Sequence, residues 1–264
     1  MRHAAAFACL LSGAACDLPP PSAVGEGPTV LATDPADGAV DVDRGRGFQV
    51  YLDRHVSPRD VHRGHIRVQS GSRSAFLSPW YDPVERVLHA ELIGAALEPS
   101  VRYRLWVEGI ADLDGVPMLD RHQITFETGT DVSGGPVAPA ASYDDVRPIL
   151  DTCAASNCHG GELPVLGLDL SDGPAIEATA IGVVAEQTRV GTQAELPWHG
   201  ARTLDGLAII DVIGGVGRPS RSYLMYKVLG DPHAAGTPMP PASPLGAEQL
   251  STLSSWIRGG APTE

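Results

Sequence analysis

The stretch VRYRLWVEG, residues 101–109, alternates apolar and charged side chains with a period of two. Successive side chains of an extended strand point to opposite faces. Tyr103, Leu105 and Val107 therefore share one face, and the arginines between them share the other. This pattern predicts a β-strand with one buried face and one solvated face.

The same alternation occurs on both sides of this stretch, in FQVYLD (residues 48–53) and in QITFETG (residues 123–129). DPADG (residues 34–38) and DLDGVP (residues 112–117) separate such runs and supply the Asp and Gly that tight turns need. Short alternating strands between regularly spaced turns indicate an antiparallel β-sandwich. We expect an all-β domain over residues 29–129.

Longer motifs in this segment carry a family resemblance. They are TDPADGAVDV (residues 33–42), FQVYLDRHV (residues 48–56), YRLWVEGIADLDGVPM (residues 103–118) and ITFETG (residues 124–129). Through them the segment resembles the bacterial Ig-like domains of exported and S-layer proteins. The resemblance implies an Ig-like sandwich that serves as a spacer or adhesion module and has no catalytic residues.

The first residues, MRHAAAFACLLSGAAC (residues 1–16), consist of a basic start, a short apolar stretch and small residues. The apolar run is too short to cross a bilayer and is typical of a secretory signal. Its end, LLSGAAC, resembles the lipobox of bacterial lipoproteins, which implies lipidation of Cys16. We expect residues 17–28 to act as a tether and the protein to be lipid-anchored in the cell envelope, at the outer membrane or the periplasmic face. An ordinary signal peptide remains the alternative.

Residues 130–141 are rich in Gly, Pro and Ser, and we interpret them as a linker. The pattern after them, over residues 142–264, is helical. Ser142 and Asp145 have the spacing of a capping box, and Pro148 suggests that the regular helix begins near it. Further helices are expected in SDGPAIEATAIGVV (residues 171–184), SRSYLMYKVLG (residues 220–230) and SPLGAEQLSTLSSWIRGG (residues 243–260). The sequence thus predicts a mainly α C-terminal domain.

CAASNCHGG, residues 153–161, contains Cys153, Cys158 and then His159. Side chains five residues apart on a helix differ by about 140° in direction. The four residues between the thiols must therefore loop if both thiols meet one object. A disulfide is possible in an exported protein, whereas zinc is disfavoured because it needs four converging ligands. Covalent haem explains why the histidine follows the second thiol directly.

A haem iron with a histidine ligand needs a sixth ligand, and methionine is usual in electron transfer. Met239 lies in HAAGTPMPP (residues 233–241), where the flanking prolines stiffen the chain. His199 and His233 are alternative ligands in nearby loops. The alternative is that Met239 is a loop side chain that packs on the core, since methionine commonly fills gaps there.

Four segments of the C-terminal half carry a second resemblance. They are SYDDVRPILDTCAASNCHGG (residues 142–161), LGLDLSDG (residues 166–173), GRPSRSYLMYKVLG (residues 217–230) and GTPMPPASPLGAEQLSTLSSWIRGGAP (residues 236–262). Together they resemble the single-haem cytochrome c domains of exported bacterial proteins. The resemblance implies haem c bound covalently by Cys153 and Cys158, with His159 and Met239 as the axial iron ligands. Four residues separate the thiols here, where the usual signature has two.

A net charge of −13 argues against nucleic acid as a partner. The sequence as a whole predicts a multidomain lipoprotein with a monohaem cytochrome c domain. Such a protein would pass single electrons to redox proteins of the envelope, as a carrier and not an enzyme. One alternative is a haem-free structural or interaction lipoprotein with a Cys153–Cys158 disulfide. Another is a subunit of a redox enzyme whose chemistry lies in a different chain.

Overall fold

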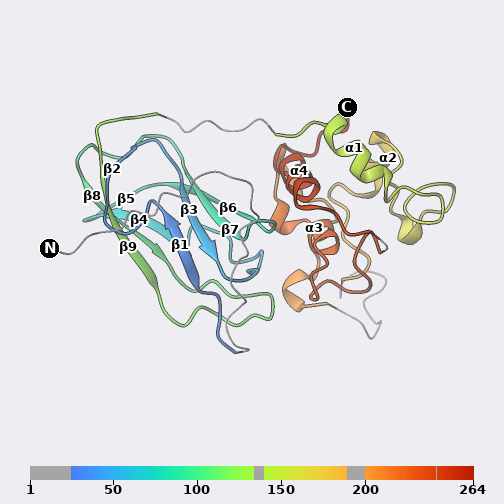
Figure 1. The fold of residues 1–264 in the computed structure, drawn as a ribbon, viewed down its shortest axis with the longest axis horizontal. Helices are drawn as coiled ribbons and strands as arrows, with labels where there is room; N and C mark the ends of the chain where they lie inside the picture. Colours follow the sequence, from blue (N-terminus) through green and yellow to red (C-terminus); the bar gives the residue numbers. More distant parts are fainter. Residues whose placement is uncertain (1–24, 134–139, 189–199, 242) are drawn as a thin grey trace.

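The computed structural model describes residues 25–133, 140–188, 200–241 and 243–264. Its strands gather in the N-terminal part and its α-helices in the C-terminal part (Figure 1). The predicted signal peptide with Cys16, and the first residues of the tether, lie outside the described residues. None of the helices in the described ranges could span a bilayer.

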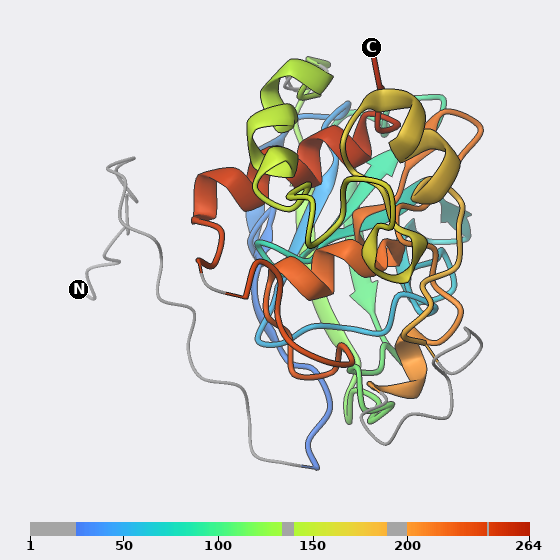
Figure 2. The same ribbon diagram turned by 90° about the vertical axis from the view of Figure 1, so that its right-hand side faces the viewer.

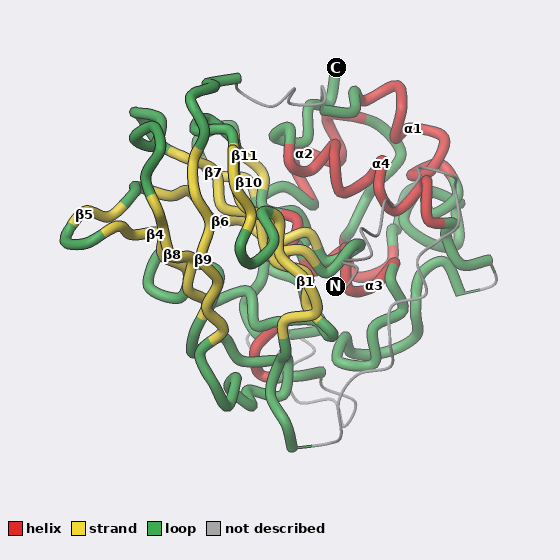
Figure 3. Tube along the Cα trace, turned by 60° about the vertical axis from the view of Figure 1, so that its left-hand side comes forward, coloured by secondary structure: helices red, strands yellow, loops and turns green. Residues whose placement is uncertain are grey.

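Two sheets form the N-terminal part, and their strands are yellow in Figure 3. The first sheet is antiparallel throughout, with the order β1 (Val30–Asp34), β3 (Phe48–Leu52), β7 (Val87–Leu92) and β6 (Leu77–Asp82). The second sheet has the order β2 (Ala39–Val42), β9 (His122–Thr128), β8 (Arg102–Val107), β4 (Ile66–Ser70) and β5 (Arg73–Ser74). The β2–β9 pair is parallel, which the sequence pattern did not predict.

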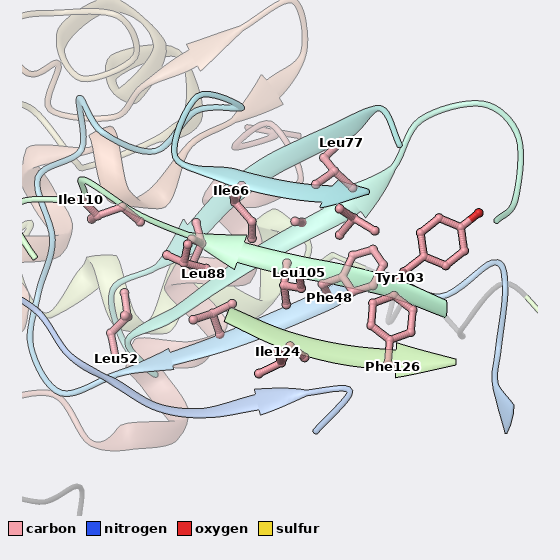
Figure 4. Close-up of a cluster of buried hydrophobic side chains, with 14 of the residues drawn as sticks. Phe48, Leu52, Ile66, Leu77, Leu88, Tyr103, Leu105, Ile110, Ile124 and Phe126 are labelled. Atoms are coloured by element: carbon pink, nitrogen blue, oxygen red, sulfur yellow. The ribbon is translucent and has the colours of Figure 1, made fainter. Parts of the chain in front are cut away.

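The core of the sandwich lies between these sheets (Figure 4). Tyr103, Leu105 and Val107 are all buried, as the alternation in β8 predicts. The ring of Phe126 on β9 lies 5.6 Å from that of Phe48 on β3 and so joins the two sheets. Each fully buried side chain of this size contributes ~1.5–3 kcal/mol relative to its exposed state.

Within residues 140–188, 200–241 and 243–264, the structure has four α-helices: α1 (Tyr143–Asp151), α2 (Gly173–Thr179), α3 (Tyr223–Val228) and α4 (Ala247–Arg258). The same described ranges also contain 3-10 helices at Val165–Gly167, Arg202–Leu204 and Pro219–Arg221, and a ribbon of β10 (Val212–Ile213) and β11 (Val216–Gly217). Trp256 of α4 is fully buried among side chains of α1 and α3. Irregular chain outweighs helix, so a mainly α domain is not shown.

The first helix begins at Tyr143, five residues before the expected start at Pro148. The predicted capping box is present: the Ser142 amide donates to the Asp145 carboxylate at 2.8 Å, and the Asp145 amide donates to the Ser142 hydroxyl at 3.3 Å. These bonds satisfy amides of the first turn. Val146 and Ile149 are buried, and this packing retains the helix despite the hydrogen bond that Pro148 removes.

The two parts pack directly against each other. Leu113 of the N-terminal part belongs to a buried cluster with Tyr223 and Tyr226 of α3. Asp82 of β6 accepts a hydrogen bond from Ser254 of α4 at 3.3 Å. In Figure 2, where the C-terminal part faces the viewer, the helices lie in front of the strands. The sandwich therefore shares an interface with the segment that contains the cysteine pair.

Candidate functional site

An apolar pocket lies between the cysteine segment, the chain that follows it, and α3. It encloses about 740 Å³, including the space at its open mouth. Aliphatic side chains form most of the wall: Val165, Leu166, Leu168, Leu170, Ile209, Leu224 and Val228. Concave sites lined mainly by aliphatic side chains, with a few polar groups, are typical binding sites for small molecules and cofactors.

Three of the predicted haem-binding residues line this pocket: Cys153, His159 and Met239. They come from the end of α1, from the loop after it and from the loop before α4. Cys158 is half-buried in the loop between Cys153 and His159 and does not line the pocket wall. Both cysteines are free thiols.

The segment between the thiols forms the loop that the spacing requires. The Cys158 amide donates to the Ala155 carbonyl at 2.8 Å, and the His159 amide donates to the Cys153 carbonyl at 3.0 Å. Gly160 closes this turn, since a β-carbon there would lie 2.1 Å from the Ala154 carbonyl oxygen. No side chain larger than hydrogen fits such a close backbone approach.

His159 has the environment of a neutral ligand. Burial lowers the pKa of its imidazole, which favours the uncharged form that binds metals. Its Nδ1 atom is buried and has no hydrogen-bond partner among the residues that the structure describes. The backbone of Leu168 and of Val165 lies close enough to the ring to oppose part of the effect of burial on this pKa. The apolar pocket, the neutral imidazole and the nearby thiol and thioether fit a haem.

Cys153 is buried enough for desolvation to raise the pKa of its thiol. The thiol therefore remains protonated at neutral pH, and protonated thiols react slowly with oxidants. Slow oxidation would keep the Cys153 thiol reduced and available for covalent attachment of a cofactor.

Lys227 of α3 holds the loop that carries Met239. The Met239 amide donates to the Lys227 carbonyl at 3.0 Å. The Lys227 ammonium donates to the carbonyls of Ala235 at 2.6 Å and Thr237 at 2.7 Å. Burial lowers the pKa of this ammonium to about 8. Lys227 is the only lysine in the sequence, but no motif in the sequence pointed to this contact.

His233, one of the alternative ligands, lies away from the pocket wall. Its Nδ1 donates to Asp231 at 2.7 Å, and its Nε2 lies 3.3 Å from a carboxylate oxygen of Asp114. His199 lies outside the described residues. Across the described ranges, no three His, Cys, Asp or Glu side chains are grouped to hold a metal ion.

Comparisons with known proteins agree with the fold of the N-terminal part. Residues 25–128 match the family model described as bacterial Ig-like domain, with boundaries close to the predicted 29–129. The two sheets and this match together define the class of the segment: it is an Ig-like β-sandwich. More particularly, it is a bacterial Ig-like domain, as its motifs predicted. No curated protein matches the chain.

Solved structures show distant likenesses. The S-layer protein rSbsC(31-844) is 13% identical with a TM-score of 0.31, over 44% of this chain and 15% of that one. PcoC, a methionine-rich copper resistance protein from Escherichia coli, is 11% identical with a TM-score of 0.32, over 38% and 97%. CopC from Methylosinus trichosporium OB3b is 10% identical with a TM-score of 0.30, over 42% and 98%. At these scores the likenesses carry no conclusion about function.

Proposed function

We propose that the chain is an envelope-anchored monohaem c-type cytochrome that passes single electrons. One observation carries this proposal: Cys153, His159 and Met239, identified from sequence as haem-binding residues, line a single apolar pocket. Met239 is 80 residues beyond His159 in the chain, so their convergence depends on the tertiary fold.

In this proposal Cys153 and Cys158 would hold haem c covalently, and His159 and Met239 would bind its iron. Bound haem would supply one-electron redox chemistry. The residues of the chain provide the environment. The aliphatic wall excludes water, and the neutral imidazole and the thioether favour the reduced metal.

Transfer of electrons fits this set of ligands better than catalysis does. His159 and Met239 would both bind the iron, and the bound group would then supply one-electron redox chemistry without a substrate on the metal. The open mouth of the pocket gives a redox partner protein of the envelope a route to the cofactor. Lipidation of Cys16 would keep the protein at the membrane, on the evidence of LLSGAAC alone.

The test is to produce the full chain in cells that attach haem covalently. We expect a Soret absorption band and a gain of one haem in the mass of the purified protein. A variant with both Cys153→Ser and Cys158→Ser should lose the covalently bound haem. A colourless protein, with the mass of its peptide and lipid only, would refute the proposal. A Cys153–Cys158 disulfide in that protein would support the haem-free alternative.

A further inference from the structure

The Met239 loop, residues 229–241, is bonded to α3 along its length. The Asp231 amide donates to the Tyr226 carbonyl at 3.0 Å near the start of the loop. The Ala235 amide donates to the Tyr223 hydroxyl at 2.9 Å in the middle. These hydrogen bonds hold residues of one short segment against α3. A shift of Asp231 would therefore move Met239 as well.

Asp231 itself is held by two histidines. One carboxylate oxygen accepts from the backbone amide of His233 at 2.8 Å and from its Nδ1 at 2.7 Å. The other oxygen is bonded to Nδ1 of His55. The Asp231 side chain is only 6% exposed, so little water competes for these bonds. Loss of one partner would leave a buried carboxylate short of a donor.

His55 belongs to the Ig-like domain, where it follows β3. The next residues are fixed by that domain, since Val56 bridges to Asp112 and the Ser57 amide donates to the Ala111 carbonyl at 2.8 Å. The His55 ring also meets the ring of Tyr226 edge-on at 6.0 Å. His55 is thus presented to Asp231 from a sheet that lies outside the C-terminal part.

We propose that His55 is a positioning residue that fixes the Met239 loop through Asp231. The Ig-like domain then does more than separate the haem site from the membrane, because it holds one wall of that site. This inference rests on the proposed function for its role of Met239, but the contact itself does not depend on haem. Leu113 of the Ig-like domain also helps to fix the Met239 loop, because it packs in one buried cluster with Ala234 of that loop.

Hydrogen–deuterium exchange of the full chain, purified without haem, tests the contact. In His55→Ala we expect peptides from the Met239 loop to exchange about tenfold faster, the effect of losing one hydrogen bond to a charged group. His55→Asn should restore slow exchange, because its amide nitrogen can take the place of Nδ1. Arg258→Ala is the matched control: Arg258 also crosses the interface, to Glu91 and Trp80, and should leave the loop unchanged.

A second measurement uses the haem-loaded chain. The reduction potential of His55→Ala should fall below that of the wild type, because the thioether ligand that raises it is held less well. Wild-type exchange in His55→Ala would overturn the inference. Equal acceleration in Arg258→Ala, or in strands β3 and β8, would also overturn it. A chain that binds no haem would refute the proposed function and leave the exchange result to decide the role of His55.

Discussion

The backbone amide of Met239 donates a hydrogen bond to the backbone carbonyl of Lys227 at 3.0 Å. This bond joins the loop of the proposed axial ligand to the end of α3, which forms part of the pocket wall. The Lys227 side chain adds two more bonds to the same loop.

Lys227→Met should destabilise the protein. The methionine keeps most of the volume of the lysine but leaves two carbonyls, those of Ala235 and Thr237, without a donor. We expect a loss of ~1.5–3 kcal/mol in the free energy of unfolding, measured by urea denaturation. Lys227→Gln, which retains a donor, should lose less. Equal stability of Lys227→Met and the wild type would show that these bonds contribute nothing.

Met239→Leu should leave covalent haem attachment intact and alter the ligand field. The reduction potential should fall and the absorption spectrum should change, because methionine ligation raises the potential. Met118→Leu is the control, since Met118 lies in the core of the sandwich. Identical spectra for Met239→Leu and the wild type would remove Met239 from the site.

Gly160→Ala should disrupt the cysteine turn. The added β-carbon would lie 2.1 Å from the Ala154 carbonyl oxygen, so the backbone must move. We expect a lower melting temperature, equivalent to ~1–3 kcal/mol, together with less haem bound per chain. Gly246→Ala tests the specificity of the effect, because the nearest atom to its β-carbon is 3.8 Å away and its φ is −73°. Similar losses in both variants would contradict this account.

The interface should weaken at high pH. The hydrogen bond with Asp231 raises the pKa of His233 to about 9, although burial opposes the shift. Because the pKa of His233 is higher in the folded state, protonated His233 stabilises the fold. This contribution to the free energy of unfolding is complete below pH 6.5 or so, the ordinary pKa of histidine, and is lost as the pH rises through about 9. We therefore expect the free energy of unfolding to decline over this range. His233→Gln should flatten that decline, and an unchanged slope would contradict the assignment.

The same cluster should also weaken in acid. Burial alone would raise the pKa of Asp231, but its hydrogen bonds with His233 and His55 lower it overall. A lowered carboxyl pKa stabilises the fold above the ordinary value of about 3.9, and this contribution is lost as the pH falls below it. Urea denaturation at pH 5 and pH 3 should show a smaller acid loss in Asp231→Asn. Parallel losses in the variant and the wild type would exclude Asp231 as the cause.

Short-range patterns predicted much of the fold. Period-two alternation identified β8 and its buried residues, and the Ser142–Asp145 pair located the start of α1 better than Pro148 did. The cysteine spacing predicted the turn between the thiols. All these features depend on residues close together in the sequence, where steric and hydrogen-bonding rules act directly.

The interface could not be predicted in this way. His55 and Asp231 are 176 residues apart, and their contact depends on how both parts fold and pack. The sequence offered His233 only as an alternative ligand, and no motif near it indicates that Asp231 and Asp114 are its partners. The helix around Lys227 is buried on all sides, so it lacks the amphipathic pattern that would separate an inner from an outer face.

The burial of Leu113 beside Tyr223 and Tyr226 makes the chain hard to divide. A C-terminal fragment produced by cutting the chain at the linker would expose these two aromatic rings to solvent. Exposed apolar surface promotes aggregation. The cysteine-containing half should therefore remain soluble only together with the sandwich. Like a bound chaperone, the sandwich covers apolar side chains that would otherwise be exposed.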